Sequence, residues 1–314
     1  MSKTVRAHTN IALIKYWGKK DKGLKIPFNS SLSLTLDQFY TDTKVSYDPS
    51  LKQDVFVLDG ELMDDHVSKR VYWFMDHIRK VYNLPYFARI ESWNHVPKEA
   101  GLASSASAFA ALAKAATLDL NLSDQELSRL ARYGSGSASR SIYGDFVKWN
   151  RGSNDEDSFA TPVDVPSWDD LRMVVCIVSD QSKPYLSSMA MDVTSDTSVY
   201  FDAWVKQSEI DLVDMEKALK LHDIKAVGLI AQSNALRMHA SLMAVNMWYF
   251  EPESLRIMNT VRELQKTIPV YFTMDAGPNV KILTTQQYLE PLLKALGEDT
   301  KNVVCSKGPA AYVL

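Results

Sequence analysis

The sequence predicts an α+β protein with two lobes. Its 314 residues exceed the roughly 250–300 residues at which a single hydrophobic core usually stops growing. Strand and helix signals are mixed along the chain without the strict alternation that marks a doubly wound parallel sheet. A polar segment with two prolines, residues 150–170, separates the two halves. We therefore expect an N-terminal lobe over residues 1–170 and a C-terminal lobe over residues 171–314.

The first half predicts strands and helices in mixed order. An apolar strand at residues 11–14 comes first, followed by strands at 43–48, 54–60 and 86–92. Apolar residues at helical spacing predict a helix over residues 66–82, and an alanine-rich helix is expected to end at residue 116. A further helix over residues 121–134 is predicted with Ser123 as N-cap, Glu126 completing a capping box and Gly134 as C-cap.

The second half begins with an apolar strand at residues 171–180. Three helical stretches are expected between about residues 194 and 265, and residues 270–283 read as strand, tight turn and strand. The chain ends on two apolar runs, residues 302–306 and 310–314, the first of which is strand-like. Cys176 and Cys305 lie in apolar, strand-like runs, which indicates buried free thiols rather than a disulfide.

Composition and charge exclude several classes of protein. Hydrophobic residues make up 46% and charged residues 23%, and the net charge is −3. This balance argues against a general nucleic-acid or membrane-surface binder, although a local basic cleft remains open. The early apolar run Ile11–Ile14 is too short for a signal peptide or a membrane span. We therefore expect a soluble, cytoplasmic protein. No Cys/His cluster has metal-ligand spacing, so we expect no structural zinc site.

The stretch "GLASSASAFAALAKAA" places Gly101, Ser104, Ser105 and Ser107 at the mouth of a helix. Free backbone N–H groups and the helix dipole favour an anion there, and serine hydroxyls suit phosphate oxygens or Mg²⁺. The spacing matches neither G-x-x-x-x-G-K-[ST] nor G-x-G-x-x-G. A serine-capped helix that packs through small residues explains the same pattern, and the residues alone leave both interpretations open.

A second serine-rich segment, residues 132–146, carries Arg140. Arginine is suited to a bidentate contact with a carboxylate or a phosphate. The alternative is a flexible loop with Arg140 in solvent. Two such segments in one lobe favour a phosphorylated ligand over two unrelated loops.

Two further stretches bring charged residues next to apolar strands. "NIALIKYWGKKD" delivers Lys15, Tyr16, Lys19 and Lys20 close together, either to a site or to a solvated basic turn. In "FTMDAGPNVKIL", Asp275 stands at the end of a strand, where a carboxylate often belongs to a site with a tuned pKa. An Asx-turn, in which Asp275 bonds its own backbone, is the equal alternative.

Together and in this order, these four stretches resemble the GHMP kinase superfamily, and within it the diphosphomevalonate decarboxylase family. The resemblance runs from Asn10 to Lys281. It implies a two-lobed GHMP kinase-like fold with the active site in the cleft, ATP as co-substrate, Mg²⁺, mevalonate 5-diphosphate as substrate and a homodimer. The implied reaction phosphorylates the C3 hydroxyl, and loss of phosphate and carbon dioxide then yields isopentenyl diphosphate in the mevalonate pathway of isoprenoid biosynthesis.

The resemblance also implies roles for individual residues. Asp275 is the expected base for the C3 hydroxyl, Arg140 holds the substrate carboxylate, and Lys19 helps to keep Asp275 ionised. The expected substrate-binding residues are Tyr16, Lys19, Ser135, Ser137, Arg140, Lys183, Ser187 and Ser188. The expected ATP-binding residues are Ser92, Asn94, Gly101, Leu102, Ala103, Ser104, Ser105 and Ser107, with Ser104 as a ligand of Mg²⁺.

The chain departs from the family pattern at two positions. Met189 replaces an arginine that is common in bacterial relatives, which removes a cation near the expected diphosphate site. Asp145 stands where a small residue or a proline is common. Two other functions therefore stay in view: a GHMP kinase that phosphorylates a mevalonate-like hydroxyl without decarboxylation, and a nucleotide-binding homologue without activity. Retention of Lys19, Arg140 and Asp275 argues against the latter.

Overall fold

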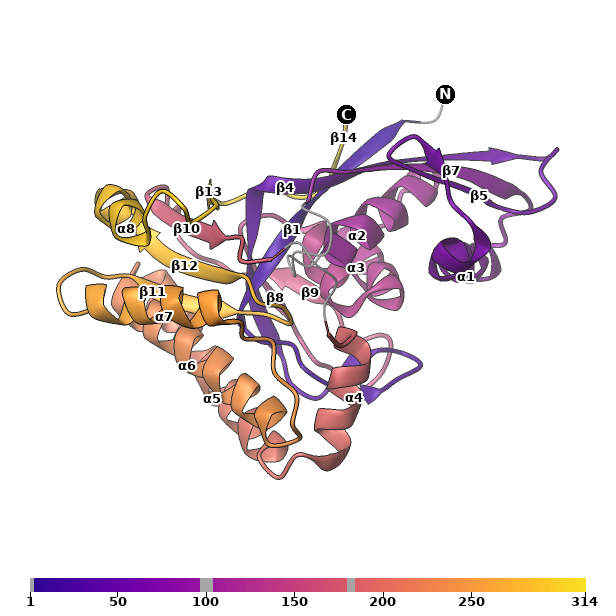
Figure 1. Cartoon of the computed structure of the whole chain (residues 1–314). Helices are drawn as coiled ribbons and strands as arrows, with labels where there is room; N and C mark the ends of the chain where they lie inside the picture. The colour runs from indigo at the N-terminus through magenta and orange to yellow at the C-terminus, as the bar shows by residue number, and fades with distance from the viewer. Residues whose placement is uncertain (1–2, 97–103, 180–183) are drawn as a thin grey trace.

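The computed structural model describes residues 3–96, 104–179 and 184–314. Within these ranges the chain forms two sheets, each with its own helices, that meet along strands β1 and β4 (Figure 1). The predicted α+β class is confirmed.

The first sheet is built around two long antiparallel strands, β1 (Thr4–Ile14) and β4 (Ser31–Asp48). Its order is β14-β1-β4-β7-β5-β6, and β8 and β9 continue from the far end of β4. The remaining strands are β7 (Phe87–Asn94), β5 (Val55–Leu58), β6 (Glu61–Leu62), β8 (Phe146–Trp149), β9 (Ala160–Pro162) and β14 (Tyr312–Val313). The C-terminal strand β14 thus joins the sheet of the N-terminal half, while the predicted division at residue 170 stays a prediction.

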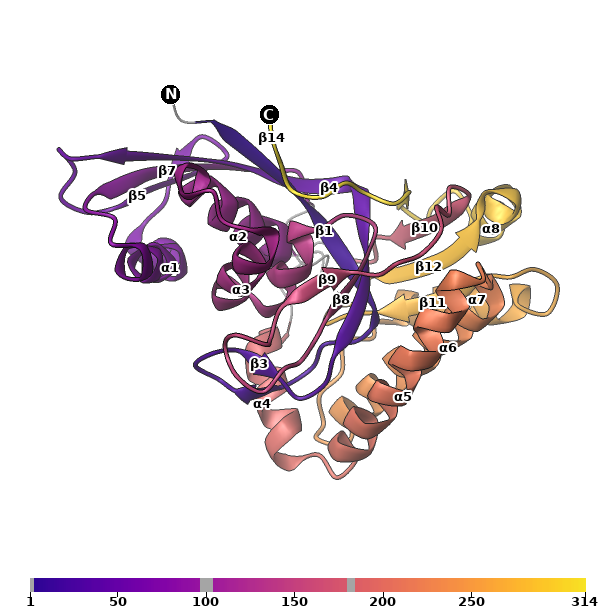
Figure 2. The ribbon, with the colours of Figure 1, turned by 180° about the vertical axis from the view of Figure 1, so that it is seen from behind.

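Three helices cover one face of this sheet: α1 (Asp65–Tyr82), α2 (Ser104–Ala116) and α3 (Asp124–Gly134) (Figures 1 and 2). The buried alanines of α2 let its backbone approach β1 and β4 closely, because a methyl group is the smallest side chain that still fills the core. The predicted capping box of Ser123 and Glu126 is confirmed.

The predicted C-cap at Gly134 is wrong. Gly134 is the last helical residue of α3, and Ser135 is the C-cap. The glycine is needed for packing instead, because a Cβ atom there would lie 2.2 Å from Cδ1 of Phe109. The following segment, expected as a serine-rich loop, is a buried 3₁₀ helix, η2 (Gly136–Ile142).

The second sheet has the order β11-β12-β10-β13, with all pairs antiparallel. Its strands are β11 (Tyr271–Met274), β12 (Val280–Thr285), β10 (Leu171–Cys176) and β13 (Asn302–Cys305). The predicted strand–turn–strand unit is therefore confirmed. Both cysteines are free and buried, as expected.

Helices pack on both faces of the second sheet. Alternate residues of β10 point to opposite cores: Met173 and Val175 face α5 (Phe201–Lys220) and α6 (Ile224–Met243), whereas Val174 and Cys176 face α7 (Pro252–Leu264) and α8 (Leu289–Leu296). This is the period-two pattern of a strand buried on both sides. The three predicted helical stretches match α5, α6 and α7, but α4 (Ser187–Thr197) was not foreseen.

Short elements complete the fold: β2 (Lys19–Asp21), β3 (Ile26–Pro27), η1 (Leu118–Leu120) and η3 (Gln286–Tyr288).

Asp145 adopts a left-handed φ of 59°, and its carboxylate lies 3.7 Å from Nζ of Lys307. Aspartate tolerates this backbone region better than most residues, which accounts for its presence at the turn. Of the helices described, none combines the length and apolarity needed to cross a membrane.

Candidate active site

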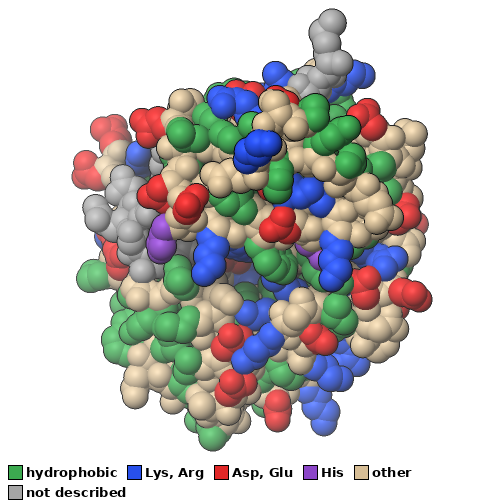
Figure 3. All heavy atoms as spheres, turned by 90° about the vertical axis from the view of Figure 1, so that its right-hand side faces the viewer, with side chains coloured by type: hydrophobic (Ala, Val, Ile, Leu, Met, Phe, Trp, Pro, Cys, Tyr) green, Lys and Arg blue, Asp and Glu red, His purple; other side chains and the backbone are tan. Residues whose placement is uncertain are grey.

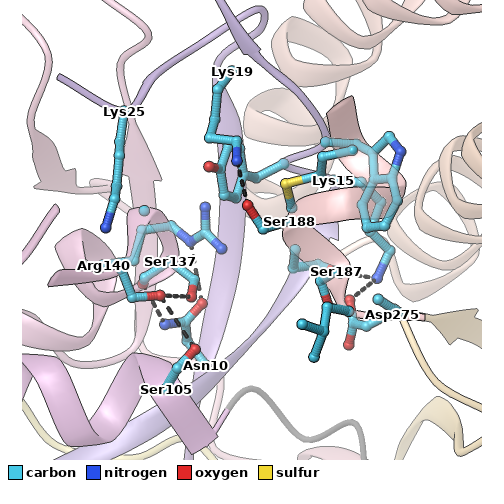
Figure 4. A pocket seen from close by; sticks show the side chains of 18 of the residues that line it. Asn10, Lys15, Lys19, Lys25, Ser105, Ser137, Arg140, Ser187, Ser188 and Asp275 are labelled. Atoms are coloured by element: carbon cyan, nitrogen blue, oxygen red, sulfur yellow. Dashed lines mark hydrogen bonds and ion pairs between the residues drawn. The ribbon is translucent and has the colours of Figure 1, made fainter. Parts of the chain in front are cut away.

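A cavity of about 660 Å³ opens where the two sheets meet. It is lined by the end of β1, the start of α2, η2, the start of α4 and the turn after β11. Figure 3 shows Lys and Arg side chains around the hollow on this face of the molecule. The close view in Figure 4 places Lys15 and Asp275 on one side and Arg140, Ser137 and Lys25 on the other.

Asp275 lies at the end of β11 between two lysines. Its Oδ1 accepts a hydrogen bond of 2.7 Å from Nζ of Lys15, and its Oδ2 lies 3.4 Å from Nζ of Lys281. Both lysine side chains are buried, whereas the Asp275 side chain is 21% exposed and faces the cavity. The carboxylate is therefore an ionised group that points at a ligand, and the Asx-turn alternative does not explain its partners.

Burial and charge act in opposite directions on this cluster. Burial alone would raise the pKa of the Asp275 carboxyl, but the ammonium groups of Lys15 and Lys281 outweigh it and hold that pKa below its usual value. Burial lowers the pKa of Lys15 to about 8, against the attraction of Asp275. Near neutral pH the pair is thus a carboxylate and an ammonium, so Asp275 carries no proton and is free to act as an acceptor.

The expected role of Lys19 beside Asp275 is wrong. Lys19 instead donates a 2.5 Å hydrogen bond to Oγ of Ser188 and lies 3.3 Å from Oδ1 of Asp192, both on α4. Lys15 and Lys281 keep Asp275 ionised in its place. Lys19 still lines the cavity, so its expected contact with substrate stays a prediction.

Arg140 is a buried cation whose hydrogen-bond partners are neutral. Its Nε donates to Oδ1 of Asn10 at 3.1 Å and to Oγ of Ser33 at 3.0 Å, and its Nη1 donates to Ser31. Burial lowers its pKa to about 10, so the guanidinium remains charged. No ion pair to Arg140 occurs in the parts of the chain that the structure describes. A guanidinium with this environment, at the wall of a cavity, is suited to bind an anion.

Tyr16 and the serines around η2 complete this wall. The Tyr16 ring packs edge-on against Trp149 with centroids 4.8 Å apart, and its hydroxyl occupies the space that a Cβ on Gly136 would fill. Burial raises the pKa of the Tyr16 hydroxyl, which keeps it a hydrogen-bond donor. Ser135 and Ser137 also line the cavity, and their expected contact with substrate stays a prediction.

Two cations of this wall were not singled out in the sequence. Lys25 donates to the carbonyl oxygens of Tyr133 and, at 2.9 Å, of Gly134, and Nη2 of Arg70 donates to the same Gly134 oxygen at 2.6 Å. Both line the cavity, and burial lowers the pKa of Lys25 to about 7. The free carbonyl groups in the last turn of α3 bind Lys25 and Arg70, and no sequence motif predicts these contacts.

The serines at the start of α2 divide into two groups. Ser104 and Ser105 line the cavity. Ser107 is fully buried, shares a 2.8 Å hydrogen bond with Oγ1 of Thr41 and donates to the carbonyl of Ser104 at 3.1 Å. Gly101, Leu102 and Ala103 lie outside the described residues.

The other expected ligands also fall in different places. Ser187 and Ser188 line the cavity from α4, and Lys183 lies outside the described residues. Ser92 shares a 2.8 Å hydrogen bond with Thr43, and Asn94 donates to the carbonyl of Val96 at 3.0 Å. Neither is a lining residue of the cavity. Their expected contacts with nucleotide stay predictions.

Magnesium is compatible with the hydroxyl oxygens at the start of α2. Among the described residues, no group of three or more His, Cys, Asp or Glu side chains could hold a metal on its own. Ser104 faces the cavity, and a hydroxyl is a ligand that Mg²⁺ accepts together with phosphate oxygens and water.

Comparison with known proteins gives family matches over both halves of the chain. Residues 7–160 match the family described as the diphosphomevalonate decarboxylase-like N-terminal domain, and residues 173–307 match the mevalonate 5-diphosphate decarboxylase C-terminal domain. A phosphomevalonate decarboxylase of Haloferax volcanii is 31% identical over 304 residues, which cover 95% of this chain and 93% of that protein.

Two solved structures have a higher sequence identity to the chain than the Haloferax protein has. One, described as MDDEF in complex with MVAPP, AMPPCP and magnesium, is 45% identical with a TM-score of 0.95, and the match covers 99% of this chain and 98% of the other. The second is the mevalonate diphosphate decarboxylase from Enterococcus faecalis, whose description refers to ATP binding mediated by mevalonate diphosphate. It is 44% identical with a TM-score of 0.94, and coverage is again 99% and 98%.

Proposed function

The chain belongs to the diphosphomevalonate decarboxylase family, and from that premise we propose that its cavity converts mevalonate 5-diphosphate and ATP to isopentenyl diphosphate, ADP, phosphate and carbon dioxide. The observation that carries the proposal is that one cavity has a negative charge on one wall and a positive charge on the other. An ionised Asp275 stands on one wall, and a buried Arg140 with neutral partners stands on the other.

Asp275 supports the first half of the reaction. The C3 hydroxyl is a poor nucleophile until its proton begins to leave, and a carboxylate within hydrogen-bond reach accepts that proton and orients the oxygen. The oxygen then forms a bond to the γ-phosphorus of ATP, and ADP leaves with the electron pair of the broken bond. Phosphoryl transfer depends mainly on positioning and charge neutralisation, which the cations around the cavity provide.

Arg140 supports the second half. The C3–O bond breaks and phosphate leaves with the bonding electrons, which leaves positive charge at C3. The bond between C2 and the carboxylate carbon then breaks, its electrons form the new double bond, and carbon dioxide departs. A guanidinium that is fixed by Asn10, Ser31 and Ser33 can hold the carboxylate in the orientation that this elimination needs.

Lys25, Arg70 and Lys19 form a third charged region, which we assign to the phosphate groups of the substrate. All three line the cavity, and Lys25 and Arg70 bond to backbone carbonyls rather than to carboxylates. A monophosphate is the alternative ligand, because the Haloferax relative is a phosphomevalonate decarboxylase. Three cations favour the more highly charged diphosphate.

ATP is proposed to approach the start of α2, where Ser104 and Ser105 face the cavity. Ser104 would hold Mg²⁺, which neutralises charge on the phosphates when it is bound with ATP. The other expected nucleotide contacts, from Ser92 and Asn94, are part of the same proposal. A homodimer and a cytoplasmic location are proposed from the family resemblance, and sedimentation of the purified chain tests the former.

The test is incubation of the purified protein with ATP, Mg²⁺ and either mevalonate 5-diphosphate or mevalonate 5-phosphate, with products identified by mass. We expect isopentenyl diphosphate from the diphosphate, with carbon dioxide and ADP formed one to one. ADP without carbon dioxide would identify a kinase instead. Faster turnover of the monophosphate would reassign the substrate, and no turnover of either would contradict an enzymatic role.

A further inference from the structure

We propose that Asn234 and Asp211, two residues outside the cavity lining, position Lys15 against Asp275 and so determine how readily Asp275 accepts a proton. The proposal rests on the proposed function, in which Asp275 accepts the proton of the C3 hydroxyl. Asn234 lies on α6 and Asp211 on α5, so the chain of contacts runs from the helical layer of the second sheet to the end of β1.

Asn234 binds the backbone of Lys15 directly. It is fully buried, and its Oδ1 accepts a 2.9 Å hydrogen bond from the Lys15 N–H group. Its Nδ2 donates to Oδ2 of Asp211 at 2.9 Å and to Oγ of Ser208 at 3.0 Å. Every hydrogen-bonding atom of this amide therefore has a partner, which fixes the side chain in one place.

Asp211 determines which way the amide points. An ionised carboxylate only accepts hydrogen bonds, so the NH₂ group of Asn234 must face it, and the amide oxygen must face Lys15. Asp211 is itself held by Arg237, which donates to Oδ2 at 2.8 Å, and by Gln207, which donates to Oδ1 at 2.9 Å. With only 7% of its surface exposed, this carboxylate has a fixed position behind the amide.

The Lys15 backbone is thereby held from both sides. Its N–H group bonds to Asn234, and its carbonyl oxygen accepts a 2.8 Å hydrogen bond from Nδ2 of Asn29. Its ammonium donates to the carbonyl of Ala12 and to Oδ1 of Asp275, each at 2.7 Å. A shift of the backbone lengthens the contact with Asp275 and weakens the attraction that keeps the carboxylate ionised.

Four groups near Asp275 bear on its titration. Lys15, directly after β1, and Lys281 on β12 pair with it directly, and Arg140 on η2 adds positive charge from across the cavity. His239 on α6 is buried, and burial lowers its pKa to about 3, so it stays neutral above pH 4. The Asn234 side chain bonds to Lys15, Ser208 and Asp211, so we expect a change in Asp275 on alteration of Asn234 to report on Lys15.

The experiment compares Asn234→Leu with Ser208→Ala. The leucine is close in shape, removes the acceptor for the Lys15 N–H group and changes no charge. We expect kcat to fall about tenfold, ATP affinity to stay within about threefold, and the acid limb of the pH profile of turnover to lie at a higher pH than in the unaltered protein. Ser208→Ala removes the other hydrogen bond of the same amide and should lower the melting temperature without moving the pH profile.

A conservative variant provides a rescue. Asn234→Gln keeps an amide oxygen for the Lys15 N–H group and an NH₂ group for Asp211, so its turnover should be closer to that of the unaltered protein than the turnover of Asn234→Leu. Asn234→Ser, whose hydroxyl is too short to reach both partners, replaces the leucine variant if that variant does not fold. An unchanged pH profile in both Asn234→Leu and Asn234→Ser would overturn the proposal. An equal shift of the pH profile in Ser208→Ala would overturn it as well.

A measurement without substrate separates this proposal from the proposed function. Carbon-13 NMR titration of the Asp275 carboxyl, assigned by its loss in Asp275→Asn, should show a higher pKa in Asn234→Leu than in the unaltered protein. If the unaltered protein releases no carbon dioxide, the proposed function fails, and this titration still decides whether Asn234 positions Lys15. An equal pKa in the two proteins would refute the positioning role even if decarboxylation is observed.

Discussion

At the scale of single residues, the buried charged side chains around the cavity lie in two different environments. Lys15 and Lys281 surround Asp275 and stabilise its charge, whereas Arg140 is buried among amide and hydroxyl groups that leave its charge uncompensated. A paired carboxylate stays ionised and can accept a proton, and a guanidinium without a counter-ion attracts one. The residue types alone do not distinguish these two environments.

Arg140→Lys should lower kcat/KM about 100-fold, which corresponds to about 2.7 kcal/mol. The ammonium keeps the charge but cannot reach Asn10 and Ser33 through one planar fork, so the substrate carboxylate loses its orientation. Steady-state kinetics checks this, with Arg151→Lys as control because the Arg151 side chain is 54% exposed. Near-normal kinetics in Arg140→Lys would remove Arg140 from the substrate site.

Lys25 should take up a proton when substrate binds. Its pKa of about 7 lies below the usual value because of burial, and a bound phosphate restores the charge. Substrate affinity should therefore weaken as pH rises from 7 to 9, with proton uptake visible by calorimetry in buffers of different ionisation enthalpy. Lys25→Met should abolish the uptake and Lys20→Met should not. Uptake that persists in Lys25→Met would assign it to another group.

The lowered pKa of Lys25 also predicts how the free energy of unfolding depends on pH. Since the unfolded chain keeps the proton on Lys25 up to a higher pH than the folded chain, this group adds stability as pH rises above about 7. The slope of unfolding free energy against pH between 7 and 9 should therefore be smaller in Lys25→Met than in the unaltered protein. Chemical denaturation at three pH values measures it, and equal slopes would contradict a lowered pKa.

At the scale of elements, the two ends of the α2 serine cluster should behave differently. Ser107→Ala loses a buried hydrogen bond to Thr41 and should cost about 1 kcal/mol of stability while KM for ATP is unchanged. Ser104→Ala, at the cavity wall, should raise KM for ATP several-fold and leave the melting temperature unchanged. A rise in KM for ATP in Ser107→Ala would show that its hydroxyl reaches the nucleotide.

Helix α4 carries Met189, which stands where the family resemblance led us to expect an arginine. Met189 is 48% exposed and does not line the cavity, while Lys25 and Arg70 provide positive charge from the other wall. We expect Met189→Arg to change the Kd for mevalonate 5-diphosphate by less than about threefold, measured by calorimetry. Tightening by fivefold or more, about 1 kcal/mol, would instead support the view that the sequence departure removes a substrate contact.

Much of the element order follows from the sequence, because strand and helix periods, the capping box at Ser123 and the turn after β11 are local signals. The site could be predicted only in part. Lys15 and Asp275 are 260 positions apart, and their contact depends on how β1 meets β11. Lys25 and Arg70 depend on where α3 ends. Such contacts follow from the assembled fold and from no single stretch.

At the scale of the whole molecule, one core joins the two sheets. Ile11 and Leu34 of the first sheet and Met173 and Leu283 of the second belong to the same buried cluster. The Lys15–Asp275 ion pair crosses at that junction, with the lysine from the first sheet and the carboxylate from the second. Catalysis as proposed therefore requires both halves of the chain in contact.

Asp275→Asn tests that central claim most directly. The amide matches the carboxylate in shape, so ATP and mevalonate 5-diphosphate should bind with Kd values within about threefold of the unaltered protein. The single-turnover rate of carbon dioxide release should fall at least about 100-fold, because the C3 hydroxyl loses its proton acceptor. Carbon dioxide release at a rate close to that of the unaltered protein would contradict the account and leave Asp275 without a part in the reaction.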